Sequence, residues 1–143
     1  MLGLAAQWLG VNQTQANSVA PILISEEQGR HKSTFCRMLM PPQLARYYSD
    51  NLKLTAQGNP ERLLAEMGLL NMDEFDKFGA QKMPLLKNLM QMSSLNICKA
   101  YQKNFRSLPR IASFIGTSNR TDLLCDPTGS RRFICIEVEH DID

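Results

Sequence analysis

Apolar runs of strand length alternate with stretches of helical periodicity along this chain. The apolar runs cover residues 20–25, 69–74, 111–117 and 133–138. The helical stretches cover residues 33–40, 59–68 and 82–92. Asn59 and Pro60 are the residue types expected at the cap and first position of the second helix. Because strands that alternate with helices need crossover connections, this order predicts an α/β fold with a mainly parallel central sheet in a three-layer sandwich.

The first ten residues predict an amphipathic helix that ends at Gly10. Its shared apolar face would hold Leu2, Ala5, Trp8 and Leu9. The first basic residue is Arg30, so the positive leader of a secretory signal is missing from this segment. We expect a single domain over residues 1–143, with an N-terminal helical segment at 1–18 and the core at 19–139.

Composition narrows the class of protein. Of the 143 residues, 43% are hydrophobic, which is enough for a packed core and argues against disorder. The apolar runs are too short for a membrane span, so no membrane partner is expected. The cysteines at positions 36, 98, 125 and 135 form no C-x-x-C pair and have no histidine at metal spacing. We therefore expect reduced thiols in a cytoplasmic protein rather than a zinc site.

The net charge of +2 hides an uneven distribution. Taken alone, this value excludes a histone-like or polyanion-coating protein. Residues 77–121, however, hold 8 basic side chains and no Asp or Glu. Residues 1–76 hold 6 basic and 8 acidic side chains, and residues 122–143 hold 2 and 6. The middle segment is the one suited to a polyanion.

A phosphate-binding loop is indicated between the first strand and its helix. Lys32 would neutralise phosphates there, and the Ser33 hydroxyl would hold Mg²⁺. The two glycine positions of the strict G-x-x-x-x-G-K-[ST] pattern hold Glu26 and His31, while Gly29 supplies flexibility at another place. The alternative is an ordinary polar loop in which Lys32 is a solvated charge.

An acidic pair ends the second apolar run. Asp73 and Glu74 follow Lys32 by about forty residues, and nucleotide hydrolysis needs one carboxylate for the metal and one for the attacking water. The alternative is a simple turn after a strand.

Two further polar features follow in order. Asn119 comes after the third apolar run, where it can hydrogen-bond the attacking water or terminal phosphate, or else cap its own turn. Arg131 and Arg132 follow the expected turn at residues 126–129, where they can reach phosphate oxygens or pair with nearby acids. The order Lys-Ser, Asp-Glu, Asn and Arg-Arg matches the parts of one class of ATPase.

Four segments carry a resemblance to a known family. They are residues 28–37, the Asp73-Glu74 strand end, residues 114–119 and residues 126–133. Together they resemble the virulence-associated protein E family, in particular members from Bacteroides-type bacteria. That family is similar to P-loop ATPases related to superfamily 3 helicases, found within primase–helicase proteins of phages, plasmids and integrated elements. The resemblance implies a P-loop NTPase fold and a chain that is a fragment of a longer primase–helicase protein.

The resemblance also implies a role for each motif residue. The nucleotide, ATP, would contact Gln28, Gly29, Arg30, His31, Lys32, Ser33 and Thr34. Mg²⁺ would be held by Ser33 and Asp73, Glu74 would activate water and Asn119 would act as the sensor. Many family members carry glycine at the positions of His31 and Glu26. A His31 in helical dihedrals would crowd the phosphates or add a donor to them.

The resemblance assigns the arginine finger to Arg131 or Arg132. Such arginines normally act across a subunit boundary, so a homo-oligomer of the full-length protein is implied.

A basic and aromatic stretch lies between the acidic pair and Asn119. Superfamily 3 helicases place a DNA-contacting hairpin between the corresponding motifs. The candidate contacts to DNA, expected to be single-stranded, are Lys99, Tyr101, Lys103 and Arg106. The alternative is a solvated basic face with its aromatic residues in the core.

Taken together, the motifs favour an ATP-binding, ATP-hydrolysing, helicase-like DNA motor domain of a mobile-element or phage replication protein. The alternative is a non-catalytic DNA-binding or assembly module with a degenerate phosphate loop. A nucleotide-dependent kinase would need a second substrate pocket, for which we find no motif.

Overall fold

The computed structural model describes residues 2–10, 18–98, 105–120 and 132–142. The α-helices are α1 (Leu2–Leu9), α2 (Lys32–Met38), α3 (Pro60–Glu66) and α4 (Met83–Gln91). Short 3₁₀ helices are η1 (Pro42–Tyr47), η2 (Ala56–Gly58) and η3 (Phe75–Lys77). The strands are β1 (Ala20–Ile24), β2 (Tyr48–Ser49), β3 (Leu69–Met72), β4 (Ser94–Cys98), β5 (Phe105–Pro109), β6 (Ser113–Ser118) and β7 (Phe133–Glu137). The α/β class predicted from the sequence is therefore confirmed.

The central sheet is parallel throughout. In the described part of the chain its strand order is β2-β3-β6-β1-β7, and each neighbouring pair is parallel. The four strands predicted from apolar runs are all present, although β3 ends at Met72 before the acidic pair and β6 begins at Ser113. β2, which has only two residues, was not predicted. Because all strands run the same way, the loops after β1, β3 and β6 meet at one edge of the sheet.

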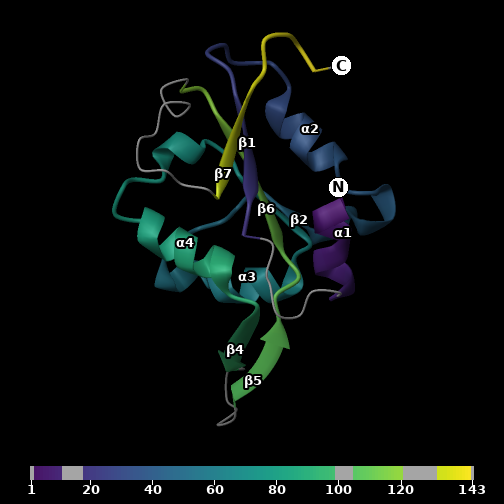
Figure 1. Cartoon of the computed structure of the whole chain (residues 1–143), viewed down its shortest axis with the longest axis vertical. Coiled ribbons are helices and arrows are strands. Elements are labelled where there is room, and N and C mark those ends of the chain that lie inside the picture. Colours follow the sequence, from purple (N-terminus) through teal and green to yellow (C-terminus); the bar gives the residue numbers. More distant parts are fainter. Residues whose placement is uncertain (1, 11–17, 99–104, 121–131, 143) are drawn as a thin grey trace.

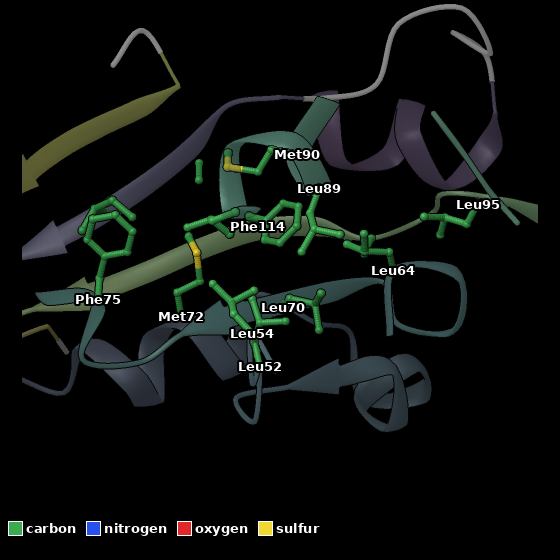
Figure 2. Close-up of a cluster of buried hydrophobic side chains, with 14 of the residues drawn as sticks. Leu52, Leu54, Leu64, Leu70, Met72, Phe75, Leu89, Met90, Leu95 and Phe114 are labelled. Atoms are coloured by element: carbon green, nitrogen blue, oxygen red, sulfur yellow. The ribbon is translucent and has the colours of Figure 1, made fainter. Parts of the chain in front are cut away.

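One face of the sheet packs against α3 and α4. Figure 2 shows this cluster, with leucines from both helices lying against Leu70 and Met72 of β3 and Phe114 of β6. Leu64, Leu86, Leu89 and Met90 are the buried residues that the two helices contribute. Burying side chains of this size contributes about 1.5–3 kcal/mol each, so this cluster is a principal source of stability.

The opposite face packs against α1 and α2, which lie on the other side of the sheet in Figure 1. Leu4 and Trp8 of α1 join this second cluster, and the Trp8 indole donates a hydrogen bond to the Gly68 carbonyl at 3.0 Å. The predicted face of α1 is partly wrong, because Ala5 is exposed and Leu9 is 77% exposed. The helix buries positions four residues apart instead. Helices therefore cover both faces, as a three-layer arrangement requires.

Asn59 occupies the N-cap position of α3, as predicted, but does not cap it with its side chain. Its backbone is left-handed, with φ 41°, and no side-chain cap hydrogen bond forms. The Asn59 carbonyl instead accepts the first backbone hydrogen bonds of the helix, from Arg62 and Leu63.

An antiparallel hairpin, β4–β5, extends from the amino end of β6. In Figure 1 it projects from the end of the molecule opposite to the loop between β1 and α2. Arg110, just after β5, is only 1% exposed and donates to the Met90 carbonyl at 2.5 Å, at the end of α4. Arg110 therefore anchors the base of the hairpin, and the basic stretch around the hairpin is not solvated throughout.

None of the helices within the described ranges is both long enough and apolar enough to cross a membrane.

Candidate functional site

A polar pocket of about 430 Å³ lies where the chain leaves β1, β3 and β6. Its lining residues are Gln28, Gly29, Arg30, His31, Lys32, Ser33, Thr34, Asp73, Glu74, Thr117, Ser118 and Asn119. All seven residues of the expected nucleotide loop are thus beside the acidic pair and Asn119. In open α/β sheets, ligands bind in crevices at the carboxyl ends of strands, and this pocket has that location.

Lys32 lies at the centre of this arrangement. The residue is only 7% exposed, and its ammonium group donates to Ser25 Oγ at 2.5 Å and to Asn119 Oδ1 at 2.8 Å. Burial lowers the pKa of Lys32, and the positive charge of Arg30 lowers it further, whereas Asp73 opposes both effects. Both acceptors are neutral oxygens. An anionic oxygen would form a stronger hydrogen bond with the ammonium group and could therefore replace them.

Asp73 is held between two hydroxyl groups. Ser33 Oγ donates to Asp73 Oδ1 at 2.8 Å, and Thr117 Oγ1 donates to the same oxygen at 2.5 Å. The first of these bonds joins α2 to the end of β3, and the second joins the end of β3 to β6. A serine hydroxyl beside a carboxylate provides the oxygen ligands that Mg²⁺ prefers.

Glu74 has a conformation different from that of its neighbour. Its backbone is left-handed, with φ 53° and ψ 51°, which costs an L-residue about 1–2 kcal/mol. Its carboxylate is half-exposed and lies 2.6 Å from the ammonium group of Lys77. The kink turns the two adjacent carboxylates to different partners, one among the hydroxyl groups and the other toward solvent. Strained residues of this kind concentrate at functional sites.

The end of β6 contacts three other parts of the site through successive side chains. Thr117 bonds Asp73, Ser118 donates to Asp76 Oδ1 at 2.8 Å, and Asn119 accepts from Lys32. The sequence predicted only Asn119 of these three. Hydroxyl residues at the end of an otherwise apolar strand were the signal that could have identified the other two. Ser25, which accepts from Lys32, was missed at the corresponding end of β1.

His31 is not helical, which corrects one expectation. Its backbone is left-handed, with φ 54°, and it precedes α2 as an exposed residue. Gly29 also has a positive φ, of 87°. The position of His31 is therefore one that glycine adopts without strain. Left-handed residues in such a loop curve the backbone so that its N–H groups can face an anion.

Arg30 lines the pocket but pairs with carboxylates. Its guanidinium lies 2.6 Å from Glu27 and 3.4 Å from Asp141, which follows β7. Glu27 therefore points to Arg30, with its side chain 72% exposed, rather than into the pocket. The Glu27 carboxylate, an acid within the loop, is thus paired with the guanidinium of its neighbour Arg30.

Of the remaining candidates, the two that the structure describes lie away from the pocket. Arg132 precedes β7 and lies beside Ala20, at the amino edge of the sheet and the length of a strand, roughly 15 Å, from the pocket edge. Arg106 is exposed on β5 of the hairpin. Four predicted residues lie outside the described ranges: Lys99, Tyr101, Lys103 and Arg131. The expected turn at residues 126–129 is outside them as well.

The fold and site define an α/β protein with a polar pocket at the carboxyl edge of a parallel sheet. The family model of the virulence-associated protein E-like domain matches residues 10–143. The chain belongs to this family, which confirms the resemblance found in the sequence.

Solved structures share the fold. An apo structure of the NrS-1 C-terminal region matches with a TM-score of 0.64 and 22% identity, covering 98% of this chain and 35% of that chain. The A form of the same region matches with a TM-score of 0.60 and 23% identity, covering 98% and 33%. This chain spans about a third of the length of those chains, and at such identity the likeness shows the fold alone. No curated protein matches this chain.

Proposed function

We propose that this chain is the ATP-binding and ATP-hydrolysing core of a replication protein that acts on DNA. The observation that carries the proposal is the convergence of Lys32, Ser33, Asp73, Glu74 and Asn119 on one pocket at the ends of three parallel strands. These side chains come from three separate segments of the sequence and belong to the types that phosphoryl transfer to water requires.

The residues fit a triphosphate and its metal. Pockets of roughly 300–1,000 Å³ suit small-molecule ligands, and this one has a volume of about 430 Å³. Lys32 has an ammonium group among neutral acceptors, so phosphate oxygens would be its stronger partners. Ser33 and Asp73 supply oxygen ligands for Mg²⁺, which in such sites is bound by one or two carboxylates together with substrate phosphates. Mg²⁺ would neutralise the charge that develops on the phosphates.

The other residues have separate tasks in this proposal. Glu74, which faces solvent beside Lys77, would orient and deprotonate the attacking water. Asn119 already lies within hydrogen-bond distance of Lys32, so its amide would sense the terminal phosphate once Lys32 turns to it.

Contact with DNA is assigned to the hairpin. Arg106 is exposed there, and the surrounding residues 77–121 hold 8 basic side chains without an acid. The hairpin projects from the end of the molecule opposite to the loop between β1 and α2 (Figure 1), and that loop lines the pocket, so a single strand could bind without covering the nucleotide. Arg132 lies far from the pocket of its own chain, which is consistent with a role at the pocket of a second copy in a homo-oligomer.

ATP binding and hydrolysis by the purified chain with Mg²⁺ test this proposal. We expect Glu74→Gln to bind ATP as the wild type does but to lose hydrolysis by about a hundredfold or more, because the exposed base is removed without loss of packing. We expect Lys32→Ala to lose ATP binding. Lys82→Ala, which changes an exposed lysine outside the pocket, is the control and should change neither quantity.

A non-catalytic DNA-binding module is the second candidate. It is favoured by the pairing of Arg30 with Glu27 and Asp141 and by the strained His31 at a glycine position. A wild-type chain that binds DNA but neither binds nor hydrolyses ATP would establish this candidate and contradict the first.

A further inference from the structure

One buried hydroxyl group contacts both members of the acidic pair. Thr117, which is 3% exposed, donates to Asp73 Oδ1 at 2.5 Å and accepts a hydrogen bond from the backbone N–H of Glu74 at 3.3 Å. A threonine hydroxyl has one proton to donate and two lone pairs to accept with, so one side chain can make both bonds at once.

The two bonds have different effects on the acids. The bond to Asp73 fixes the direction of the carboxylate that also accepts from Ser33. The bond from the Glu74 amide holds the left-handed residue at which the chain turns, with φ 53°. Without the hydroxyl, the Asp73 carboxylate could rotate and the Glu74 kink would lose a bond that stabilises it.

Thr117 is itself fixed by its position. It belongs to β6, which lies between β1 and β3 in the sheet, and it pairs with Leu23 of β1. A hydroxyl on a central strand is a more rigid support than one on a loop, because the backbone is held on both sides.

We propose that Thr117 is a positioning residue that sets the metal affinity of Asp73 and the direction of Glu74. The inference rests on the proposed ATPase function and deepens it by naming the residue on which Mg²⁺ affinity depends. Groups that orient a metal ligand through a hydrogen bond typically change metal affinity or activity by about 10–100-fold when they are removed.

The test compares three variants in the whole chain. Thr117→Val keeps the shape and loses the hydroxyl, whereas Thr117→Ser keeps the hydroxyl. The matched control is Ser113→Ala, which removes a buried hydroxyl on the same strand and the same face, one for which no hydrogen-bond partner is present among the described residues. Each protein is titrated with Mg²⁺ at saturating ATP, and ATP binding is also measured in EDTA.

We expect Thr117→Val to raise the Mg²⁺ concentration for half-maximal hydrolysis by about 10–100-fold and to lower the maximal rate. ATP binding in EDTA should stay within about twofold, because Lys32 and the loop are unchanged. Thr117→Ser should restore the Mg²⁺ dependence, and Ser113→Ala should match the wild type. A role in folding alone would lower the melting temperature without moving the Mg²⁺ midpoint.

The outcomes separate this inference from the function on which it rests. A wild type that neither binds nor hydrolyses ATP overturns both. A wild type that hydrolyses ATP, together with a Thr117→Val variant of unchanged Mg²⁺ midpoint, overturns the positioning role alone. If Thr117→Val does not fold, Thr117→Ala is measured in its place and judged by the same midpoint.

Discussion

Replacing Arg110 with alanine should destabilise the fold, whereas replacing Arg106 should not. The two arginines are four residues apart in the basic stretch, and the sequence alone gives no reason to separate them. In the structure, Arg110 is 1% exposed at the end of α4, while Arg106 is exposed on β5. The contrast tests which part of the stretch is available to DNA.

The magnitude follows from the environment of Arg110. Burial lowers its pKa to about 10 from 12.5, which corresponds to a cost of about 3 kcal/mol for holding the charge there. Its guanidinium donates to the carbonyls of Met90 and Leu89, and hydrogen bonds from charged groups contribute about 1.5–3 kcal/mol each. It also lies 5.6 Å from the centre of the Phe114 ring, a contact of about 2 kcal/mol when desolvated.

The favourable contacts exceed the burial cost, and alanine would in addition leave a cavity and remove the Arg110 donor from the Met90 carbonyl. We therefore expect Arg110→Ala to lower the free energy of unfolding by about 3 kcal/mol. For a urea slope of about 2 kcal/mol/M, the midpoint of denaturation would fall by roughly 1.5 M. Arg106→Ala should change the free energy by less than about 0.5 kcal/mol.

Urea denaturation followed by circular dichroism measures the stability of both variants. Binding of single-stranded DNA at several salt concentrations measures the contribution of Arg106 to the DNA contact. We expect Arg106→Ala to weaken DNA binding and to flatten its salt dependence, since a phosphate contact is lost. An Arg110→Ala variant as stable as the wild type would refute the anchoring role. An Arg106→Ala variant with unchanged salt dependence would refute the hairpin as the DNA surface.

Two further predictions concern the pocket and the core beneath it. His31→Gly should raise the free energy of unfolding by about 0.5–1 kcal/mol, because relief of the left-handed strain exceeds the entropy that glycine adds to the unfolded chain. His31→Ala keeps the strain and is the control. Equal stability of the two variants would show that the left-handed backbone of His31 is not strained. Burial raises the pKa of Cys36 to about 12 from 9.0, so its thiolate fraction at pH 8 falls on the order of a thousandfold. Iodoacetamide should therefore label Cys36 only after denaturation, and mass spectrometry of the native protein checks this.

The fold could be predicted for strands that are buried on both faces of the sheet, because such strands are continuous apolar runs in the sequence. β1, β3 and β6 are apolar runs because helices cover both faces of the parallel sheet. β2 left no such signal, because two residues cannot show a period and its pairing with β3 is decided by tertiary contacts. The apolar face of α1 was predicted only in part, since the choice between Trp8 and Leu9 depends on where the helix lies against Gly68.

The sequence indicated part of the pocket lining but not Thr117, Ser118 or the side-chain pairings. The sequence named Lys32, Asp73 and Asn119 as candidates, and the structure brings them to one pocket because parallel strands bring their carboxyl ends together. The left-handed backbone of His31 could not be predicted from the sequence, because a histidine in this conformation is an exception that tertiary structure imposes. The pairing of Arg30 with Asp141 joins residues more than a hundred positions apart, for which sequence spacing gives no rule.

β6 gives the proposed function a physical connection between its two ends. Its amino end follows Arg110, which anchors the base of the hairpin to α4, and its carboxyl end bears Thr117, which holds the acidic pair. The strand is paired with β1 on one side and with β3 on the other. The strand thus joins the base of the hairpin to the acidic pair, and its end also places Asn119 beside Lys32.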